Sequence, residues 1–462
     1  MRDIWMLVAA LCVATSAMAQ SDTVSSAEAT TPVEAVGSTE SGYGKADGLM
    51  ENGALARYHR SSLYSVLMSH SSFPYGSEIE QAFFSIPTPD KFNDHNLAVR
   101  SFESSARKMR KGKKAEAQNL QDIEAFIRAN DVPRELVAKW FNRDLQTGGF
   151  DINLMLERGF YDASESDIAL AVASGRGIQS VGDGGAELIG KTFLLVNDIT
   201  YVDRGERSAL VGEILRGIGG ILSAASSSSS YEDLGNAAGD LAEEVDGFKV
   251  NITSYLYRLD WNPEVAETFW SQYWTVNPHV DPARYEAFNQ SPLFRMIYVG
   301  STTTSAANLS SRSFAQRPKN EQMLRVCARA VDKSIVELQR AYDEFKVNTP
   351  IERINADERT VEVAIGLKEG INKRSKFDVL MPVQNENGTI SYERVGRIEP
   401  IEGKIWDNRF GALEALEAGE ESDEEGKEGN AALRYTTFRI TDGARRIVPG
   451  CLIREETIRR DK

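Results

Sequence analysis

The sequence is poor in the residues that carry metal and imidazole chemistry, with four histidines and three cysteines among 462 residues. Such a composition offers few ligands for a soft metal ion. Basic residues are also outnumbered, because 53 lysines and arginines stand against 68 aspartates and glutamates. The resulting net charge of −15 disfavours binding to a polyanion, so we expect no nucleic-acid partner.

Linear catalytic motifs are missing as well. The sequence contains no G-x-S-x-G nucleophile elbow, no H-E-x-x-H helix and no paired cysteine ligands. Ser105 and Lys108 fit the spacing S-x-x-K, but a nucleophile in this charged run would be fully hydrated, so we attribute the match to chance.

The histidines are scattered, and Asp94-His95 is the single acid–histidine neighbour pair. We interpret them as structural, and we predict no catalytic, cofactor-binding or metal-ligating residue and no cofactor. The four are His59, His70, His95 and His279.

The start of the chain predicts export. Arg2 precedes an apolar run over 4–13, and small residues follow up to Ala19. This pattern is typical of a secretory signal peptide, here 1–19, cleaved before Gln20. No later apolar run reaches the ~20 residues that a membrane-spanning helix needs.

Cleavage would remove Cys12, whose preceding Leu11 does not fit a lipoprotein signal. Cys327 and Cys451 would remain. An oxidising compartment could join them, but we expect them to be separate and buried.

Composition and periodicity predict an α+β multidomain protein. The segment 20–45 has hardly any large apolar side chain and should be a flexible tether. We expect a mainly helical region over 46–184, an α/β sandwich domain over 185–348, and a small β-barrel over 349–462 with an acidic insertion at 414–429.

Within the helical region, RSSLYSVLMSH (60–70) has apolar residues at helical spacing, and IEQAFFSIPTP (79–89) ends in prolines. We therefore expect a helix followed by an extended stretch. Asp131 and Pro133 predict the start of a further helix, and INLMLERG (152–159) continues the helical periodicity.

The α/β domain is predicted from strands that alternate with helices. Segments rich in apolar and β-branched residues predict strands at 191–202, 248–261 and 294–305. Helical patterns lie at 264–274, 282–290 and 320–345.

Short strands and turns follow Pro350 and favour a small β-barrel. The expected strands are 360–367, 376–383, 390–401, 436–441 and 447–455, with a turn at 385–388.

One phosphate-loop expression is present, because Gly185–Thr192 reads G-x-x-x-x-G-K-[ST]. In such a loop Lys191 would contact a terminal phosphate and Thr192 a magnesium ion. The motif needs a strand before it and a helix after it, whereas here a strand is expected after Thr192. We therefore interpret Gly190 as a helix end that leads into this strand.

Four further segments have both a plain and a functional interpretation, and in each case we favour the plain one. The basic run 107–114 is interpreted as a solvated face, although it could contact lipid phosphates or an acidic partner. The acidic run 414–428 is interpreted as a solvated insertion, since it lacks the geometry of a calcium loop. The glycine-rich segment 210–225 is interpreted as a loosely held helix and loop rather than a membrane or subunit contact. The aromatic residues of 254–261 and 267–274 are expected in a core rather than in a sugar-binding platform.

Segments over most of 55–455 resemble an uncharacterised family of exported proteins from Bacteroidetes. That resemblance implies export but no activity. The segments are RSSLYSVLM (60–68), IPTPDKFNDHNLAVR (86–100), AKWFNRDLQTGGFD (138–151), ERGFYDAS (157–164), GKTFLLVNDITYVD (190–203), TSYLYRLDWN (253–262), YVGSTTTS (298–305), IGLKEGINKRSKFDVL (365–380) and VGRIEPIEGKIWDNR (395–409).

The C-terminal part is also distantly similar to the β-barrel at the end of flagellar assembly protein T. The similarity lies in GLKEGINKRSKFDVL (366–380), VGRI (395–398) and VPGCLI (448–453). The α/β part before it is similar in layout to curli-secretion-type envelope proteins. Both resemblances imply a non-enzymatic assembly component of the outer envelope.

We therefore expect a non-catalytic exported protein of the periplasm or outer membrane that acts in interaction or assembly within the cell envelope. Its partners would be envelope or outer-membrane proteins, and homo-oligomers and peripheral membrane association both stay open. The alternative is an exported hydrolase with an active site of dispersed residues, which leaves no linear motif. A hydrolase should have a deep pocket with titratable side chains, whereas a scaffold should have shallow surfaces and an apolar patch.

Overall fold

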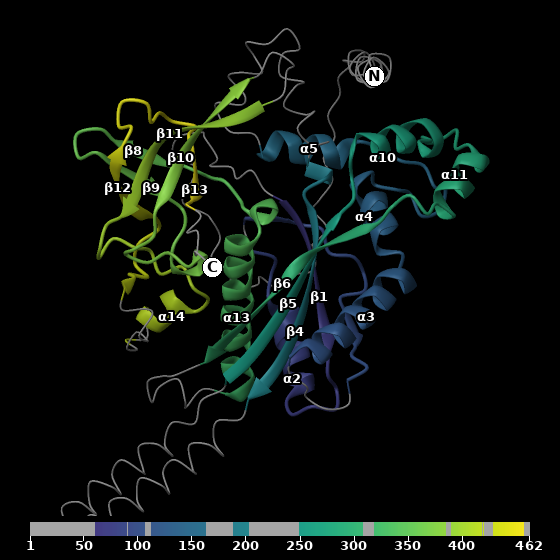
Figure 1. The fold of residues 1–462 in the computed structure, drawn as a ribbon, viewed down its shortest axis with the longest axis horizontal. Helices are drawn as coiled ribbons and strands as arrows, with labels where there is room; N and C mark the ends of the chain where they lie inside the picture. The colour runs from purple at the N-terminus through teal and green to yellow at the C-terminus, as the bar shows by residue number, and fades with distance from the viewer. Residues whose placement is uncertain are drawn as a thin grey trace, which may run out of the picture.

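The computed structural model describes residues 61–89, 91–106, 112–162, 188–202, 249–307, 318–384, 390–417, 419 and 428–456. The expected signal peptide (1–19), the tether (20–45) and the glycine-rich segment (210–225) lie outside the described residues. The described residues form an α+β protein with two sheets, as expected (Figure 1).

The first sheet has six strands. Its order is β2-β1-β4-β5-β6, and β3 pairs with the same edge of β1 as β2 does. β1 runs parallel to β2, β3 and β4, whereas β4, β5 and β6 are antiparallel to one another. The strands are β1 (Ser61–Ser69), β2 (Phe92–Asp94), β3 (Ser101–Glu103), β4 (Thr192–Val202), β5 (Lys249–Leu259) and β6 (Met296–Ala307).

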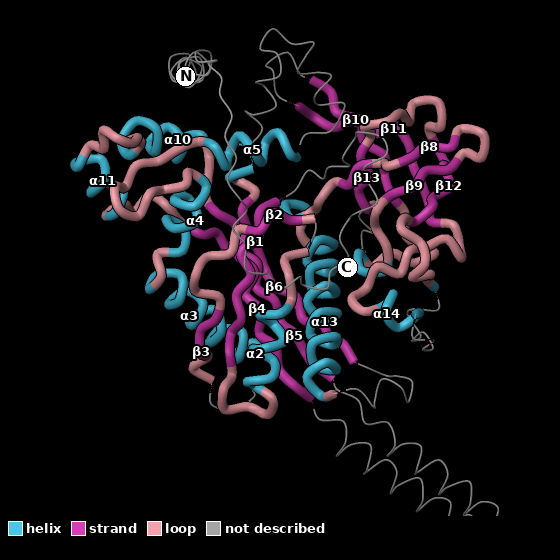
Figure 2. Tube along the Cα trace, turned by 180° about the vertical axis from the view of Figure 1, so that it is seen from behind, coloured by secondary structure: helices cyan, strands magenta, loops and turns pink. Residues whose placement is uncertain are grey.

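Helices cover both faces of this sheet, so the layers are helix, sheet and helix (Figures 1 and 2). α2 (Gly76–Ser85) and α13 (Lys319–Ala341) cover one face. The other face is covered by α3 (Lys113–Ala129), α4 (Val132–Trp140), α5 (Asn153–Asp162), α10 (Pro263–Thr268), its π-helical continuation η1 (Phe269–Tyr273) and α11 (Pro282–Asn289).

The expectation for 60–89 is wrong in both halves. Residues 61–69 form β1, and Gly76–Ser85 form the helix α2. β1 is buried on both faces, so its apolar residues do not alternate with polar ones as in a half-exposed strand. A short apolar run of this kind fits a helix or a buried strand equally well. In α2 the buried residues Ile79, Ala82 and Phe83 recur at helical spacing, and the helix ends before the Ile86-Pro87 pair.

The other helices and strands expected before Pro350 are confirmed where the structure describes the chain. α4 begins after Asp131, α5 covers most of 152–159, and α13 occupies most of 320–345. β4, β5 and β6 lie where strands are expected. β1 and β4 pair over seven residues, so the sheet joins strands from both sides of the boundary expected at 184/185.

The second sheet curls into a half-barrel. Its order is β7-β13-β10-β11-β12-β9-β8, and β9 to β13 match the five expected strands. The strands are β7 (Thr349–Pro350), β8 (Arg353–Asn355), β9 (Thr360–Val363), β10 (Phe377–Gln384), β11 (Ile390–Pro400), β12 (Thr436–Asp442) and β13 (Leu452–Glu455).

The two outer strands of this sheet are consecutive in the chain. Between them, the Ile351 N–H donates to the Cys451 carbonyl at 3.0 Å and the Glu352 N–H donates to the Glu362 carbonyl at 2.9 Å. One stretch of chain therefore pairs first with β13 and then with β9, which brings the two edges of the sheet together. We call residues 61–345 the α/β lobe and residues 349–456 the half-barrel lobe.

The two described cysteines are free and buried, as expected. Cys327 belongs to α13 and lies in the core between this helix and the six-stranded sheet, and Cys451 lies in the core of the half-barrel lobe.

Candidate functional site

The main candidate site lies at the carboxyl end of β1. His70 is the first residue after this strand, and a short loop leads from it to α2. β1 and β4 are parallel neighbours, and the Asp198 side chain comes from β4 beside the end of β1. The carboxyl ends of parallel strands are common places for functional side chains in α/β proteins.

A buried polar network forms there. His70 Nε2 lies 2.7 Å from Asp198 Oδ1, with the His70 side chain 5% exposed. Asn119 of α3 donates from Nδ2 to Asp198 Oδ2 at 2.8 Å and to the Tyr255 hydroxyl at 3.0 Å. The network therefore ties the loop after β1, a covering helix, β4 and β5 to one carboxylate.

The orientation of His70 is fixed on two sides. Its ring stacks on Phe73 with the centroids 4.6 Å apart and the planes 2° apart. In the tautomer whose Nε2–H donates to Asp198, the other ring nitrogen is an acceptor. That atom, Nδ1, is buried and has no hydrogen-bond partner. The pair therefore has the arrangement of a carboxylate-oriented base.

The loop between β1 and α2 depends on a glycine. A Cβ atom on Gly76 would lie 2.3 Å from the carbonyl oxygen of His70. Real Cβ atoms do not approach an oxygen so closely, so a larger residue would displace the backbone that carries the histidine.

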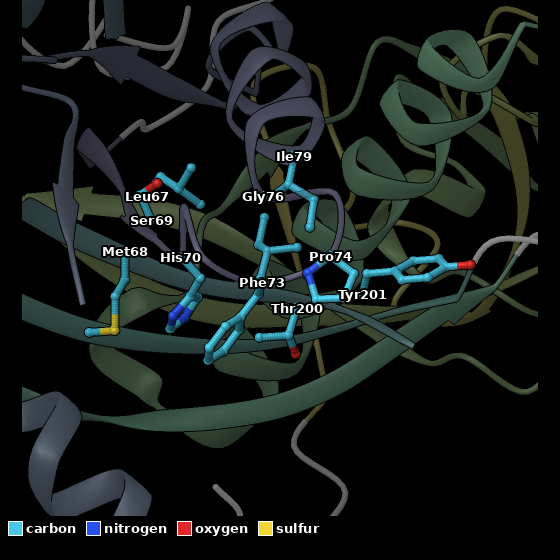
Figure 3. A pocket seen from close by; sticks show the side chains of 11 residues that line it. Leu67, Met68, Ser69, His70, Phe73, Pro74, Gly76, Ile79, Thr200 and Tyr201 are labelled. Atoms are coloured by element: carbon cyan, nitrogen blue, oxygen red, sulfur yellow. The ribbon is translucent and has the colours of Figure 1, made fainter. Parts of the chain in front are cut away.

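The cavity beside His70 is small. Figure 3 shows side chains from β1, the following loop, α2 and β4 around it. Its volume of about 10 Å³ has room for about one water molecule. An organic substrate does not fit next to the His70–Asp198 pair in this conformation.

This pairing was not found from the sequence. His70 and Asp198 are separated by 128 positions, and His70 was interpreted as one of four scattered structural histidines. No linear signal links the two residues. Only the parallel pairing of β1 with β4 brings them together.

His95, from the acid–histidine neighbour pair, is structural as expected. Its Nε2 lies 3.0 Å from the Leu136 carbonyl, and its Nδ1 lies 2.8 Å from Arg158. Burial and then the neighbouring Arg158 charge hold its pKa well below the usual range. His95 is therefore a neutral ring that joins β2 to α4 and α5.

The phosphate-loop expression does not have phosphate-loop structure in its described part. Leu188 and Ile189 form a helical turn, and β4 begins at Thr192, so a strand follows the motif as expected. The Thr192 hydroxyl is buried and accepts a hydrogen bond from Trp140 Nε1 at 2.8 Å. Gly185 and its two successors lie outside the described residues.

The charged segments are described in part. In the basic run, Lys113 and Lys114 are exposed in the first turn of α3, and 107–111 lie outside the described residues. The Ser105 hydroxyl of the S-x-x-K match accepts from Gln118 at 2.9 Å, whereas Lys108 lies outside them. The acidic run begins within α14 (Ala412–Glu417), and most of the rest also lies outside.

The aromatic residues of 254–261 and 267–274 lie in the core, as expected. Tyr255, Tyr257, Phe269 and Tyr273 are buried between the sheet and the helices, and three tryptophans pack against them. They are structural rather than a surface platform.

The two lobes meet along α13, which lies between the two sheets in both views (Figures 1 and 2). Arg340 near its end donates to Glu455 Oε1 at 2.9 Å and to the Gly370 carbonyl at 3.0 Å. Arg325, more than three turns earlier, donates to the Gly411 carbonyl at 3.3 Å. The opposite side of α13 packs on the six-stranded sheet through residues such as Cys327 and Leu338.

Comparison with known proteins gives no assignment, because no protein-family model and no curated protein matches the chain. Among the described helices, none is long and apolar enough to cross a membrane. Within the described ranges, no three His, Cys, Asp or Glu side chains gather as a metal-binding group.

Proposed function

We propose that the protein is a non-catalytic, exported component of the cell envelope, in the periplasm or at the outer membrane, that binds other envelope proteins. The observation that carries this proposal is the double role of α13. One side of this helix completes the core of the α/β lobe, and its arginines bind the half-barrel lobe. The lobes are thus held in a fixed relation, which suits an interaction or assembly component.

The surface of the half-barrel lobe adds support. α14 exposes Leu413 by 50% and Leu416 by 48%, next to the acidic insertion. Exposed apolar side chains with a polar rim are common at protein-interaction sites. We also propose that the chain consists of an α/β sandwich domain followed by a small β-barrel. The hydrogen bonds of Ile351 and Glu352, which pair one stretch of chain with both edges of the second sheet, support a barrel.

The test compares three proteins in envelopes extracted with a mild detergent: wild type, Arg340→Ala and the matched control Arg353→Ala. Arg353 forms an exposed ion pair within the half-barrel lobe and does not contact α13 in that pair. We expect wild type and Arg353→Ala to migrate in a large complex and Arg340→Ala, folded but with loosened lobes, to leave it. A monomer in all three extracts would contradict the proposal.

The second candidate is the exported hydrolase with a dispersed active site, and the His70–Asp198 pair favours it. Chromogenic ester, peptide and glycoside substrates test it with wild type and His70→Gln. Turnover that is abolished in His70→Gln would establish this alternative. Equal background rates in both proteins would contradict this alternative.

A further inference from the structure

A second small cavity lies at the edge of β1, in the gap between β2 and β3. β2 pairs with residues 61–63 of β1, and β3 pairs with residues 67–69. Among the strands described, residues 64–66 of β1 therefore have no neighbouring strand on this edge. The walls come from β1, the end of α2, the proline-rich segment after it, and α13. The cavity has a volume of about 10 Å³, so it holds about one water molecule or one oxygen atom of a group that sits at its mouth.

Arg100 lines this cavity and carries an unpaired charge. Its guanidinium carbon lies 5.7 Å from the centroid of the Phe83 ring and 5.6 Å from that of Phe84. The Nε atom is buried without a hydrogen-bond partner. In the described part of the chain, the guanidinium forms ring contacts but no hydrogen bond or ion pair. Its backbone is fixed, because the Arg100 carbonyl accepts from the Leu67 N–H at 2.9 Å.

Two hydroxyl groups in the walls can also donate hydrogen bonds to a ligand. The Thr88 hydroxyl accepts a hydrogen bond from Asn96 Nδ2 at 3.2 Å, and the Ser65 hydroxyl accepts one from Asn197 Nδ2 at 3.2 Å. Each hydroxyl can still donate its own proton. Both hydroxyls and the Arg100 guanidinium can therefore donate to a ligand that only accepts hydrogen bonds.

We propose that this cavity, the Arg100 pocket, binds a carboxylate group on an acidic peptide segment of a partner protein. The inference rests on the proposed interaction function and names the chemistry of one partner. A guanidinium is planar and can bind both oxygens of a planar carboxylate through two parallel hydrogen bonds.

The rim of the pocket fits a peptide rather than a free ion. Phe84 and Val99 are both 43% exposed beside the cavity, and Ile86, Pro87 and Pro89 form apolar walls. An acidic residue flanked by apolar side chains would bury this surface while its carboxylate meets Arg100. Because the protein carries a net charge of −15, long-range attraction cannot guide an acidic partner, and the affinity must come from these local contacts.

The test uses isobutyrate as the probe, because it joins a carboxylate to a small apolar group, and isobutyramide as its neutral counterpart. Both are titrated at constant ionic strength into the chain from Gln20, and the Nε–H resonance of Arg100 and the melting temperature are followed.

We expect saturable binding of isobutyrate and none of isobutyramide. Arg100→Gln should weaken isobutyrate binding at least tenfold, and Thr88→Val several-fold. The control Arg128→Gln changes an exposed arginine of α3 and should bind as wild type does.

Several results would overturn the pocket. These are no saturable binding, equal binding of the amide, undiminished binding by folded Arg100→Gln, and tighter binding of inorganic phosphate. If Arg100→Gln does not fold, Thr88→Val decides. Isobutyrate binding with a monomeric wild type in the envelope would keep the pocket and reject the proposed function. A large envelope complex in which isobutyrate does not bind would do the reverse.

Discussion

Arg340 on α13 forms a charge-assisted hydrogen bond to Glu455 at the end of β13, with Nη2 and Oε1 2.9 Å apart. The same guanidinium nitrogen donates to the Gly370 carbonyl. Burial lowers the pKa of Arg340, but the hydrogen bond and the charge of Glu455 outweigh it and raise this pKa above its usual value. Arg340 thus joins α13 of the α/β lobe to two parts of the half-barrel lobe, the turn at Gly370 and the end of β13.

Arg340→Ala should therefore loosen the lobes without unfolding either one. We expect a loss of about 1–2 kcal/mol, since the pair is partly exposed and solvent screens it. Limited proteolysis should cleave the variant faster near residue 348, and Arg353→Ala should be cleaved like wild type. Equal cleavage of all three proteins would show that Arg340 does not hold the lobes together.

Glu352 gives the half-barrel lobe a pH-dependent stability. Burial raises the pKa of this carboxyl group from 4.5 to about 7. Between these values the folded protein keeps a proton that the unfolded chain has lost, so stability falls as the pH rises through this window. Glu352→Gln removes the effect and should gain stability relative to wild type at pH 8 but not at pH 4. The gain should be at most about 1–2 kcal/mol, because the group is partly exposed. The measurement is urea unfolding of both proteins at pH 4 and pH 8. The same stability difference between Glu352→Gln and wild type at the two pH values would contradict this prediction.

The fold was only partly predictable from the sequence, and the error at β1 has consequences for the site. β4 and β5 were found because they are long and rich in β-branched residues. The apolar run of β1 predicts a helix, because burial on both faces removes the alternation that marks a strand. That error also hid the site, since His70 meets Asp198 only when β1 lies beside β4.

The Arg100 pocket was hidden for a similar reason. Its donors come from β1, from the segment after α2 and from the residue before β3, and no spacing in the sequence relates them. By contrast, β9 to β13 were predictable, because their apolar residues lie between segments rich in turn-forming residues, whereas the very short β7 and β8 were not expected.

Thr192 should stabilise the α/β lobe through its hydrogen bond from Trp140. Thr192→Val keeps the shape but leaves the buried indole N–H without an acceptor, which should cost about 1–3 kcal/mol. Thr192→Ser keeps the hydroxyl and serves as the control. Urea unfolding of both variants decides, and an equal loss in the two would mean that the hydrogen bond contributes nothing.

Cys327 and Cys451 should be unreactive in the folded protein. Burial raises the pKa of the Cys327 thiol to about 12, and it also raises the pKa of Cys451. A thiol-specific reagent at pH 8 should therefore modify neither residue until denaturant is added, and both afterwards. Rapid labelling of Cys327 or Cys451 in the native protein, or a mass two hydrogens lower that shows a disulfide between them, would contradict the separate buried positions.

Our central claim is that the protein works by binding other envelope proteins while α13 holds its two lobes in place. The most direct test is the native mass of the wild-type protein in gently extracted envelopes, with the co-migrating proteins identified. We predict a complex well above the monomer mass that contains outer-membrane or periplasmic proteins. A lone monomer would contradict the claim and would direct attention to the His70–Asp198 pair as the centre of an enzyme.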